Sequence, residues 1–347
     1  MSEIALDGIL VGDDHPPYCI AELGHNHMGS VAEAKRLIEV AVEKGADAVK
    51  LQKRNNELLY TKRFFESAYN SEAAYAPTYG KHREALEFGR DEYLDLQEYS
   101  TYLGITFVAT PFDLDSLEFL EDLNVPYFKI ASGSLTNPVL LRAVASIGKP
   151  ILASFGGAPL ASIARAVEAL ASGGSPLVLL HCVAGYPAKP NELGLERIAW
   201  LAAEYPEYVI GFSDHDDGVA MGAVAYVHGA RVFEKHITMS HANRGTDHAF
   251  ALEPGGLGSY IRNLKEAHLA SQWQEQPLEI EKGPMKKMGA SVYLSRNMRA
   301  GERITAGDLV LKSPIDGLEG WEYDSLIGKQ LLVNVNAEQA LRREYFD

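Results

Sequence analysis

Short apolar runs alternate with amphipathic stretches from about residue 18 to about residue 270. The stretches 31–45 and 160–174 place apolar residues at helical spacing, and the second reaches a pair of glycines of the kind that often ends a helix. Strand–helix alternation repeated eight times predicts a parallel sheet. The runs predicted as strands are 18–24, 47–52, 105–110, 126–132, 149–154, 176–182, 208–214 and 230–236.

Two α/β folds are compatible with this alternation. Eight strand–helix units in about 250 residues suit a closed (β/α)8 TIM barrel. The alternative is an open, doubly wound sheet, which commonly has a glycine-rich phosphate-binding sequence after its first strand. No such sequence follows the run 18–24, so the closed barrel is favoured.

The pattern changes twice outside this alternation. Residues 271–288 are polar and contain two prolines, which predicts a linker between a barrel domain at 1–270 and a further domain at 289–347. The last segment has short β-branched runs separated by turn sequences, which predicts a small, mostly β domain.

The connection 53–103 is longer than a usual βα connection, and it is either a cover over a site at the barrel top or a plain surface excursion.

Composition narrows the class of partner. The net charge of −15 argues against nucleic acid or an anionic membrane surface. Cys19 and Cys182 lie in apolar runs and are interpreted as buried thiols of a reducing compartment. We find neither a signal-peptide pattern nor an apolar run long enough to span a membrane, so a cytoplasmic enzyme is expected.

Polar residues gather where the predicted strands end, which is where barrel enzymes place their active sites. A buried charge costs several kcal/mol unless it is paired or liganded. A ring of such residues at one end of a barrel therefore predicts a site. The ring contains Glu22, Lys50, Gln52, Thr110, Lys129, Ser132, Ser154, Ser213, Asp214, His215, Glu234, Lys235 and His236.

Strand periodicity divides this ring between two faces. Alternate residues of a strand share a face, so Asp214 and Lys235 are expected to point toward the helices, paired with other charges. The pairs expected to share the opposite face are Lys50 with Gln52, Ser213 with His215, and Glu234 with His236.

His215 and His236 end neighbouring predicted strands. Neutral imidazoles are common ligands of divalent transition metals, and two of them leave coordination positions for water and substrate. The two histidines are therefore candidate metal ligands. The alternative is that one or both only bond the backbone or the substrate.

Lys50 and Lys129 are the best candidates to hold an anion. With neighbouring hydroxyl groups they supply the cations and donors that a phosphate or a carboxylate needs. The same lysines also suit a Schiff-base aldolase, or simple ion pairs with glutamates. Glu22 either acts as an acid or base, or pairs with a lysine.

At these residues the chain resembles the sialic acid synthase family, whose members condense phosphoenolpyruvate with N-acetylmannosamine or related sugars. The resemblance covers nearly the whole chain, and its C-terminal part is similar to the antifreeze-like (SAF) domain of that family. The segments that carry it are IAELGHNHMGS (20–30), AVKLQ (48–52), ATPFD (109–113), FKIASG (128–133), GFSDH (211–215), EKHIT (234–238) and GTDHAFALEP (245–254).

The resemblance implies a role for each matching residue. His215 and His236 would bind the divalent metal, manganese or magnesium, and Glu22, Lys50 and Lys129 would take part in catalysis. It also implies a homodimer in which the C-terminal domain of one chain covers the barrel mouth of the other. Phosphoenolpyruvate would be held by Lys50, Thr110, Lys129, Ser132, Ser154 and Ser213, and the sugar by Gln52, Tyr186 and Asp247.

Three residues and one segment depart from the family pattern. The family commonly has an acidic residue at Ser134, a polar residue at Ala184 and an arginine at Ser313, and SFGGAP (154–159) replaces the usual Ser-Thr-Gly-Met. The residues for phosphoenolpyruvate and the metal are kept, so the departures concern the acceptor sugar.

Three functions are compatible with these residues and with the resemblance. The first is a metal-dependent synthase that makes a sialic-acid-like 3-deoxy-2-ulosonic acid. The others are a non-catalytic metabolite-binding descendant and a lysine Schiff-base aldolase.

Overall fold

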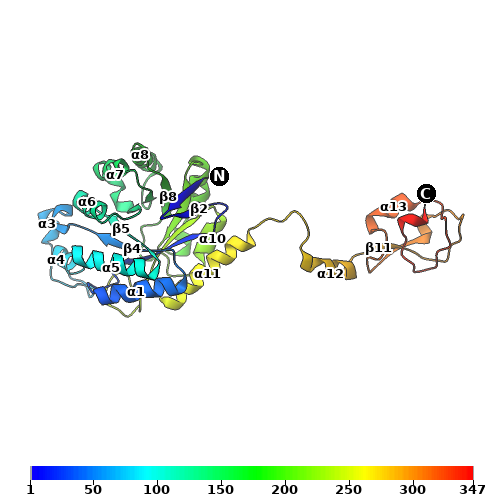
Figure 1. Cartoon of the computed structure of the whole chain (residues 1–347), viewed down its shortest axis with the longest axis horizontal. Coiled ribbons are helices and arrows are strands. Elements are labelled where there is room, and N and C mark those ends of the chain that lie inside the picture. The colour runs from blue at the N-terminus through cyan, green and yellow to red at the C-terminus, as the bar shows by residue number, and fades with distance from the viewer. Residues whose placement is uncertain (1, 347) are drawn as a thin grey trace. The chain divides into compact units, whose positions relative to one another are not determined.

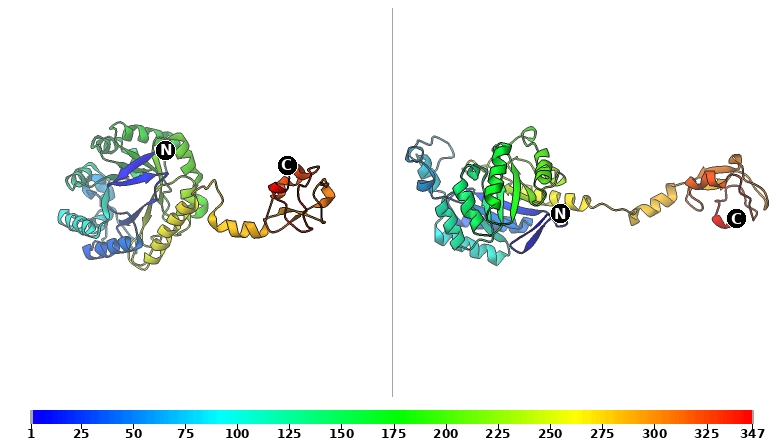
Figure 2. Two further views of the ribbon diagram at one scale, coloured as in Figure 1. Left: turned by 45° about the vertical axis from the view of Figure 1, so that its right-hand side comes forward. Right: turned by 90° about the horizontal axis from the view of Figure 1, so that it is seen from above.

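The computed structural model describes residues 2–346 and forms two compact units, Met1–Ser271 and Gln272–Asp347 (Figure 1). The first unit contains a sheet of eight parallel strands. Helices surround these strands, as Figure 2 shows. The strands are β3 (Tyr18–Gly24), β4 (Ala48–Lys53), β5 (Thr106–Pro111), β6 (Phe128–Ile130), β7 (Ile151–Ser154), β8 (Leu177–Cys182), β9 (Val209–Asp214) and β10 (Val232–His236).

The sheet is a closed barrel. The strand order is β5-β4-β3-β10-β9-β8-β7-β6, so the last strand of the barrel, β10, pairs with the first strand of the barrel, β3. The two ends of that order, β5 and β6, contact each other. The predicted (β/α)8 barrel is therefore confirmed, and the open-sheet alternative is wrong.

The strands are buried on both faces, which explains their nearly continuous apolar runs. Their outer faces pack against the helices, whereas apolar residues such as Ile20, Val108 and Val232 form a separate core inside the barrel. Two positions further along the same face, Glu22, Thr110 and Glu234 take the place of apolar residues. The inner face thus changes from apolar to polar toward the carboxyl ends of the strands.

An antiparallel hairpin, β1 (Glu3–Leu6) and β2 (Ile9–Gly12), precedes the barrel. Its residues Ile4, Leu6 and Val11 belong to the same core as the inward-facing residues at the amino ends of the strands. The hairpin therefore closes the end of the barrel opposite the polar residues. The sequence pattern did not predict it.

The helices follow the strands in the predicted alternation. Ser30 caps the first helix by accepting a hydrogen bond from the Glu33 amide, and Gly45 ends it in the left-handed conformation with φ of 83°. The main helices are α1 (Val31–Lys44), α5 (Arg90–Leu103), α6 (Leu114–Asp122), α7 (Pro138–Ser146), α8 (Leu160–Ala171), α9 (Glu196–Glu204), α10 (Met221–Val227) and α11 (Pro254–Ala270). Among the helices of residues 2–346, none combines the length and the hydropathy that crossing a membrane requires.

The long connection after β4 folds into three short helices before α5. They are α2 (Asn56–Leu59), α3 (Lys62–Phe65) and α4 (Tyr79–Glu84). The Tyr75 hydroxyl donates a hydrogen bond to the Arg244 carbonyl, at 2.6 Å, and so joins this segment to the loop that follows β10. That loop lies at the carboxyl ends of the strands, so the connection reaches the polar end of the barrel.

The second unit has its own small core. Strands β11 (Ser291–Leu294) and β12 (Leu309–Lys312) pair antiparallel, and α13 (Tyr323–Leu326) follows them. Val292, Leu294 and Ile304 are among the residues packed inside it. Before these strands, the segment predicted as a linker contains an exposed helix, α12 (Glu279–Met288).

Candidate active site

One cavity of about 460 Å³ opens at the carboxyl ends of the barrel strands. The structure brings all twelve predicted site residues to its walls, although they come from segments far apart in the chain. They are Glu22, Lys50, Gln52, Thr110, Lys129, Ser132, Ser154, Tyr186, Ser213, His215, His236 and Asp247.

The predicted division between the two faces is confirmed. Lys235 is not among the residues lining the cavity, and its ammonium group lies 3.1 Å from Oδ2 of Asp214 on the opposite face. It also bonds the carbonyl and the carboxylate of Asp216. This buried cluster links β9 to β10 directly behind His215 and His236.

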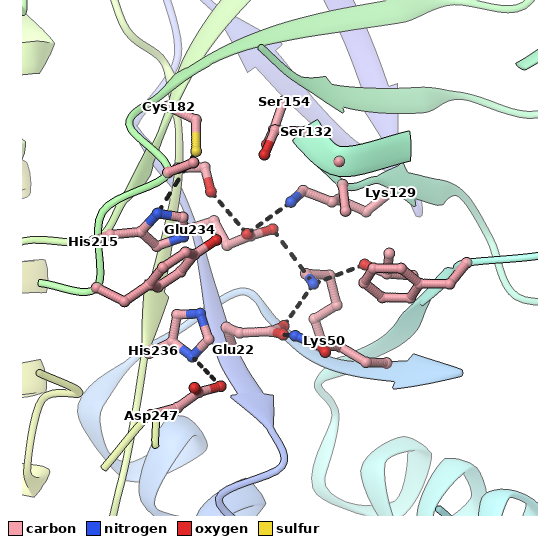
Figure 3. A pocket seen from close by; sticks show the side chains of 18 of the residues that line it. Glu22, Lys50, Lys129, Ser132, Ser154, Cys182, His215, Glu234, His236 and Asp247 are labelled. Carbon is pink, nitrogen blue, oxygen red and sulfur yellow. Dashed lines mark hydrogen bonds and ion pairs between the residues drawn. The ribbon is translucent and has the colours of Figure 1, made fainter. Parts of the chain in front are cut away.

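Two ion pairs cross the floor of the cavity (Figure 3). Nζ of Lys50 lies 2.6 Å from Oε2 of Glu22, and Nζ of Lys129 lies 3.0 Å from Oε1 of Glu234. Lys50 also donates to the Thr110 hydroxyl at 2.9 Å. Lys50 is thus held by a carboxylate of the neighbouring strand β3, and Lys129 of β6 by a carboxylate that reaches across the barrel from β10. Periodicity placed Glu234 on the inner face, but its role as the partner of Lys129 comes only from the structure.

The two carboxyl groups have opposite pKa shifts. Burial raises the pKa of Glu22, and Lys50 only partly offsets this effect. Burial also raises the pKa of Glu234, but the ammonium groups of Lys129 and Lys50 outweigh it and bring the pKa to about 2. Glu234 is therefore a fixed negative charge, whereas Glu22 is the carboxyl group that can take up and release a proton.

His215 and His236 lie side by side, with ring centroids 5.6 Å apart. Burial lowers the pKa of His215 to about 3 and that of His236 to about 4, so both are neutral at pH 7. Nδ1 of His215 lies 2.8 Å from the Val183 carbonyl oxygen. Because a carbonyl can only accept, this nitrogen carries the hydrogen and Nε2 keeps its lone pair.

His236 has an unsatisfied polar atom. Its Nδ1 is buried without a hydrogen-bond partner within residues 2–346, and the nearest carboxylate oxygen, on Asp247, is 3.8 Å away. Two neutral imidazoles are a suitable donor set for a divalent transition metal. No group of three or more His, Cys, Asp or Glu side chains in the described chain could hold a metal alone. Water or substrate oxygens would have to complete the coordination.

Of the three residues predicted to face a sugar, Tyr186 and Asp247 lie beside these histidines, and Gln52 bonds Glu22. The Tyr186 ring centroid is 4.4 Å from that of His215, and Tyr186 is more than half exposed. Gln52 donates to Oε1 of Glu22 at 2.7 Å. Asp247 lies beside His236, as Figure 3 shows. The cavity therefore has a lysine and serine side and a histidine side.

Sequence reasoning missed two arginines that line the cavity, Arg54 and Arg83. Arg54 follows Gln52 at the strand period, so extending the alternation past β4 would have found it. Arg83 lies on α4 in the long connection, where no periodic pattern of apolar residues indicates which way a side chain points. The structure therefore favours the interpretation that this connection covers the site.

Comparison with known proteins identifies the family of this chain. A model of the NeuB family matches residues 37–276, which is more than half of the chain. The chain belongs to the NeuB family. A SAF domain model matches residues 289–344, within the second unit. The protein is therefore an enzyme of the sialic acid synthase type.

Relatives match along nearly the whole length. The human N-acetylneuraminate-9-phosphate synthase is 34% identical over 343 residues, covering 98% of this chain and 95% of the relative. The N,N'-diacetyllegionaminic acid synthase of Legionella pneumophila is 32% identical, covering 95% and 94%. The sialic acid synthetase structure from Leptospira borgpetersenii superimposes with a TM-score of 0.72 at 32% identity, covering 82% of this chain and 95% of that one.

Proposed function

We propose that this enzyme condenses phosphoenolpyruvate with an aldose, giving a 3-deoxy-2-ulosonic acid and inorganic phosphate, and that it requires a divalent cation. One observation carries the proposal. A single cavity joins two buried lysines to two neutral, adjacent histidines. The first pair suits an anionic substrate, and the second suits a metal that activates a carbonyl group.

Phosphoenolpyruvate would occupy the lysine side. An ammonium group has three N–H donors, so Lys50 and Lys129 can each keep a glutamate and still donate to a substrate oxygen. The Ser154 hydroxyl is buried without a hydrogen-bond partner in the described chain, which leaves it available to the same anion. The remaining donors to phosphoenolpyruvate would be the hydroxyl groups of Thr110, Ser132 and Ser213.

His215 and His236 would hold the cation, which is expected to be manganese or magnesium. When bound there, it would act as a Lewis acid on the aldehyde oxygen of the acceptor. Gln52, Tyr186 and Asp247 would bind the sugar on that side of the cavity. This places the aldehyde next to the lysine side, where C3 of phosphoenolpyruvate would be held.

The reaction balances with one water molecule. C3 of phosphoenolpyruvate forms the new carbon–carbon bond to the aldehyde carbon, whose oxygen becomes a hydroxyl group. Water adds at C2, and the bond between C2 and the phosphate oxygen breaks, leaving a ketone and inorganic phosphate. Glu22 would take the proton from this water, because burial raises its pKa and Lys50 keeps it at the cavity floor.

Phosphate release provides the test. Phosphoenolpyruvate and manganese or magnesium are combined with a panel of aldoses, and phosphate is measured with each component omitted in turn. The expected result is release only when all three are present. Phosphoenolpyruvate binding without release for any aldose would support the non-catalytic alternative and overturn the proposal.

We also propose a homodimer in which the SAF domain of one chain covers the barrel mouth of the other. The second unit exposes large apolar side chains, including Trp321 with 97% of its surface accessible, which suits a protein contact. Light scattering should give twice the mass of 38.0 kDa for the full chain. If a shortened chain that ends at Ser271 is still a dimer, the SAF domain is not what joins the two chains, and the proposed homodimer is contradicted.

A further inference from the structure

The missed arginines form a cluster around His25. Nη1 of Arg54 lies 3.2 Å from Nε2 of His25, and Nη1 of Arg83 lies 3.0 Å from Nδ1 of the same ring. All three residues line the cavity. Arg54 directly follows β4, Arg83 lies on α4, and His25 directly follows β3.

These contacts cannot all be hydrogen bonds. A neutral imidazole has one accepting nitrogen and one N–H group, whereas guanidinium groups only donate. Burial, Arg54 and Arg83 hold the pKa of His25 well below its usual value, so the ring is neutral. His25 therefore accepts from one arginine and presents an N–H to the other. One imidazole nitrogen thus has to serve two guanidinium groups, and the nearest carboxylate oxygen of the described residues, Oε1 of Glu87, stays 3.9 Å from His25.

The two arginines also differ in their counter-charges. Arg54 shares Glu87 with Lys53, at 4.0 Å and 3.4 Å respectively. Arg83, which is half-buried, has no carboxylate within 4.0 Å among residues 2–346, and its other partner is the Tyr79 hydroxyl, at 3.1 to 3.2 Å. A cavity-lining guanidinium group without a paired carboxylate is a position where an anion binds favourably.

The position of the cluster identifies which substrate it faces. Oδ2 of Asp247 lies 3.8 Å from Nδ1 of His236, and Asp247 lines the same cavity as the three residues of the cluster. A Cβ atom at Gly24, the residue before His25, would lie 3.4 Å from both Asp247 and His236, so Asp247 stands where the histidine pair meets the loop that carries His25. An acceptor whose aldehyde is at the histidines and whose chain passes Asp247 would place its far end at Arg83.

We propose that Arg54, Arg83 and His25 form an anion subsite that selects an acceptor sugar with a phosphate monoester at the end remote from its aldehyde. This inference rests on the proposed condensation. A carboxylate has two oxygens, which one guanidinium group can bind in bidentate fashion. Two guanidinium groups on different elements, together with an imidazole N–H, suit the three terminal oxygens of a phosphate better.

The test compares three acceptors: N-acetylmannosamine, its 6-phosphate and its 6-carboxylate. The wild-type enzyme should use the 6-phosphate with the highest kcat/KM. Arg83→Gln should lower the ratio of kcat/KM for the 6-phosphate to that for the neutral sugar by about 10- to 100-fold, because it removes a charge-assisted hydrogen bond. The KM for phosphoenolpyruvate should change much less.

Lys81→Gln is the matched control. Lys81 lies on the same helix, is exposed and pairs with Glu84, so its loss removes the same charge without touching the cavity. The ratio should stay at its wild-type value. Equal use of the neutral and phosphorylated sugars by the wild type, or an equal effect of both variants, would overturn the subsite. Preference for the 6-carboxylate would overturn the assignment to phosphate.

Binding measurements separate this inference from the condensation itself. The alditols obtained by reducing N-acetylmannosamine and its 6-phosphate are titrated calorimetrically into the full chain loaded with phosphoenolpyruvate and manganese. The phosphorylated alditol should bind more tightly, and Arg83→Gln should remove most of that difference. If no aldose reacts but this difference is seen, the condensation fails and the subsite stands. If an aldose reacts but the two alditols bind equally well, the condensation stands and the subsite fails.

Discussion

The ammonium group of Lys235 lies 3.1 Å from Oδ2 of Asp214, on the outer face of the barrel behind the two histidines. Both side chains are buried, and Asp216 completes the cluster. Since the metal ligands proposed here come next in the chain to Asp214 and Lys235, this pair sets the position of β9 against β10. The cluster therefore supports the site without lining it.

Lys235→Met should lower the free energy of unfolding by about 3–5 kcal/mol, because two buried carboxylates lose their cation. Urea denaturation followed by circular dichroism measures the change. Lys282→Met, at an exposed pair with Glu279, serves as the control and should leave stability nearly unchanged. Equal effects of the two substitutions would contradict the structural role given to Lys235.

His215→Ala and His236→Ala should each weaken manganese binding by at least about 100-fold, because loss of a direct ligand exceeds the usual effect of a supporting residue. Electron paramagnetic resonance of free manganese gives the dissociation constant without relying on turnover. His15→Ala, at the hairpin end of the barrel, should bind manganese like the wild type. Unchanged affinity in either site variant would remove that histidine from the metal site.

Lys129 should not form a Schiff base. Burial lowers its pKa, but Glu234 and other neighbours outweigh this effect and raise it, so the neutral amine needed for attack on a carbonyl is scarce. Treatment with phosphoenolpyruvate, an aldose and borohydride should add no mass to the protein, and a chelator should stop phosphate release. A trapped adduct on Lys129 or Lys50, with activity insensitive to chelator, would instead indicate the aldolase.

Acid should destabilise the fold partly through His27. Its ring stacks on Phe88, and burial lowers its pKa to about 4. A histidine with a lowered folded pKa favours the neutral form, so stability is present above pH 6.5 and is lost as the pH falls toward 4. The wild type should lose about 3 kcal/mol more than His27→Gln between pH 7 and pH 4 in urea titrations. Parallel losses in the two proteins would rule out this contribution.

Much of the barrel follows from local pattern. The run 18–24 coincides with β3, and the helical stretch 31–45 coincides with α1 to within one residue. The run 126–132 was too long, because β6 ends at Ile130 and a 3-10 helix begins at Ser132. Apolar character alone does not mark the end of a strand, since the chain stays buried as it turns.

The hairpin β1–β2 was missed for a related reason. Its exposed Ile9 and Leu10 disturb the alternation of apolar and polar residues, and four-residue strands give little signal. Its place in the fold depends on apolar side chains at the amino ends of the barrel strands, which are far away in the chain.

The sequence by itself determined the barrel, the end that carries the chemistry and the face on which each strand-end residue lies. Those properties depend on periods of two and of about 3.6 residues, which are local. Tertiary structure alone decided that Glu234 holds Lys129, and that Arg83 reaches His25 across 58 positions. Such contacts depend on closure of the barrel and on the path of an irregular connection, and no local period encodes either.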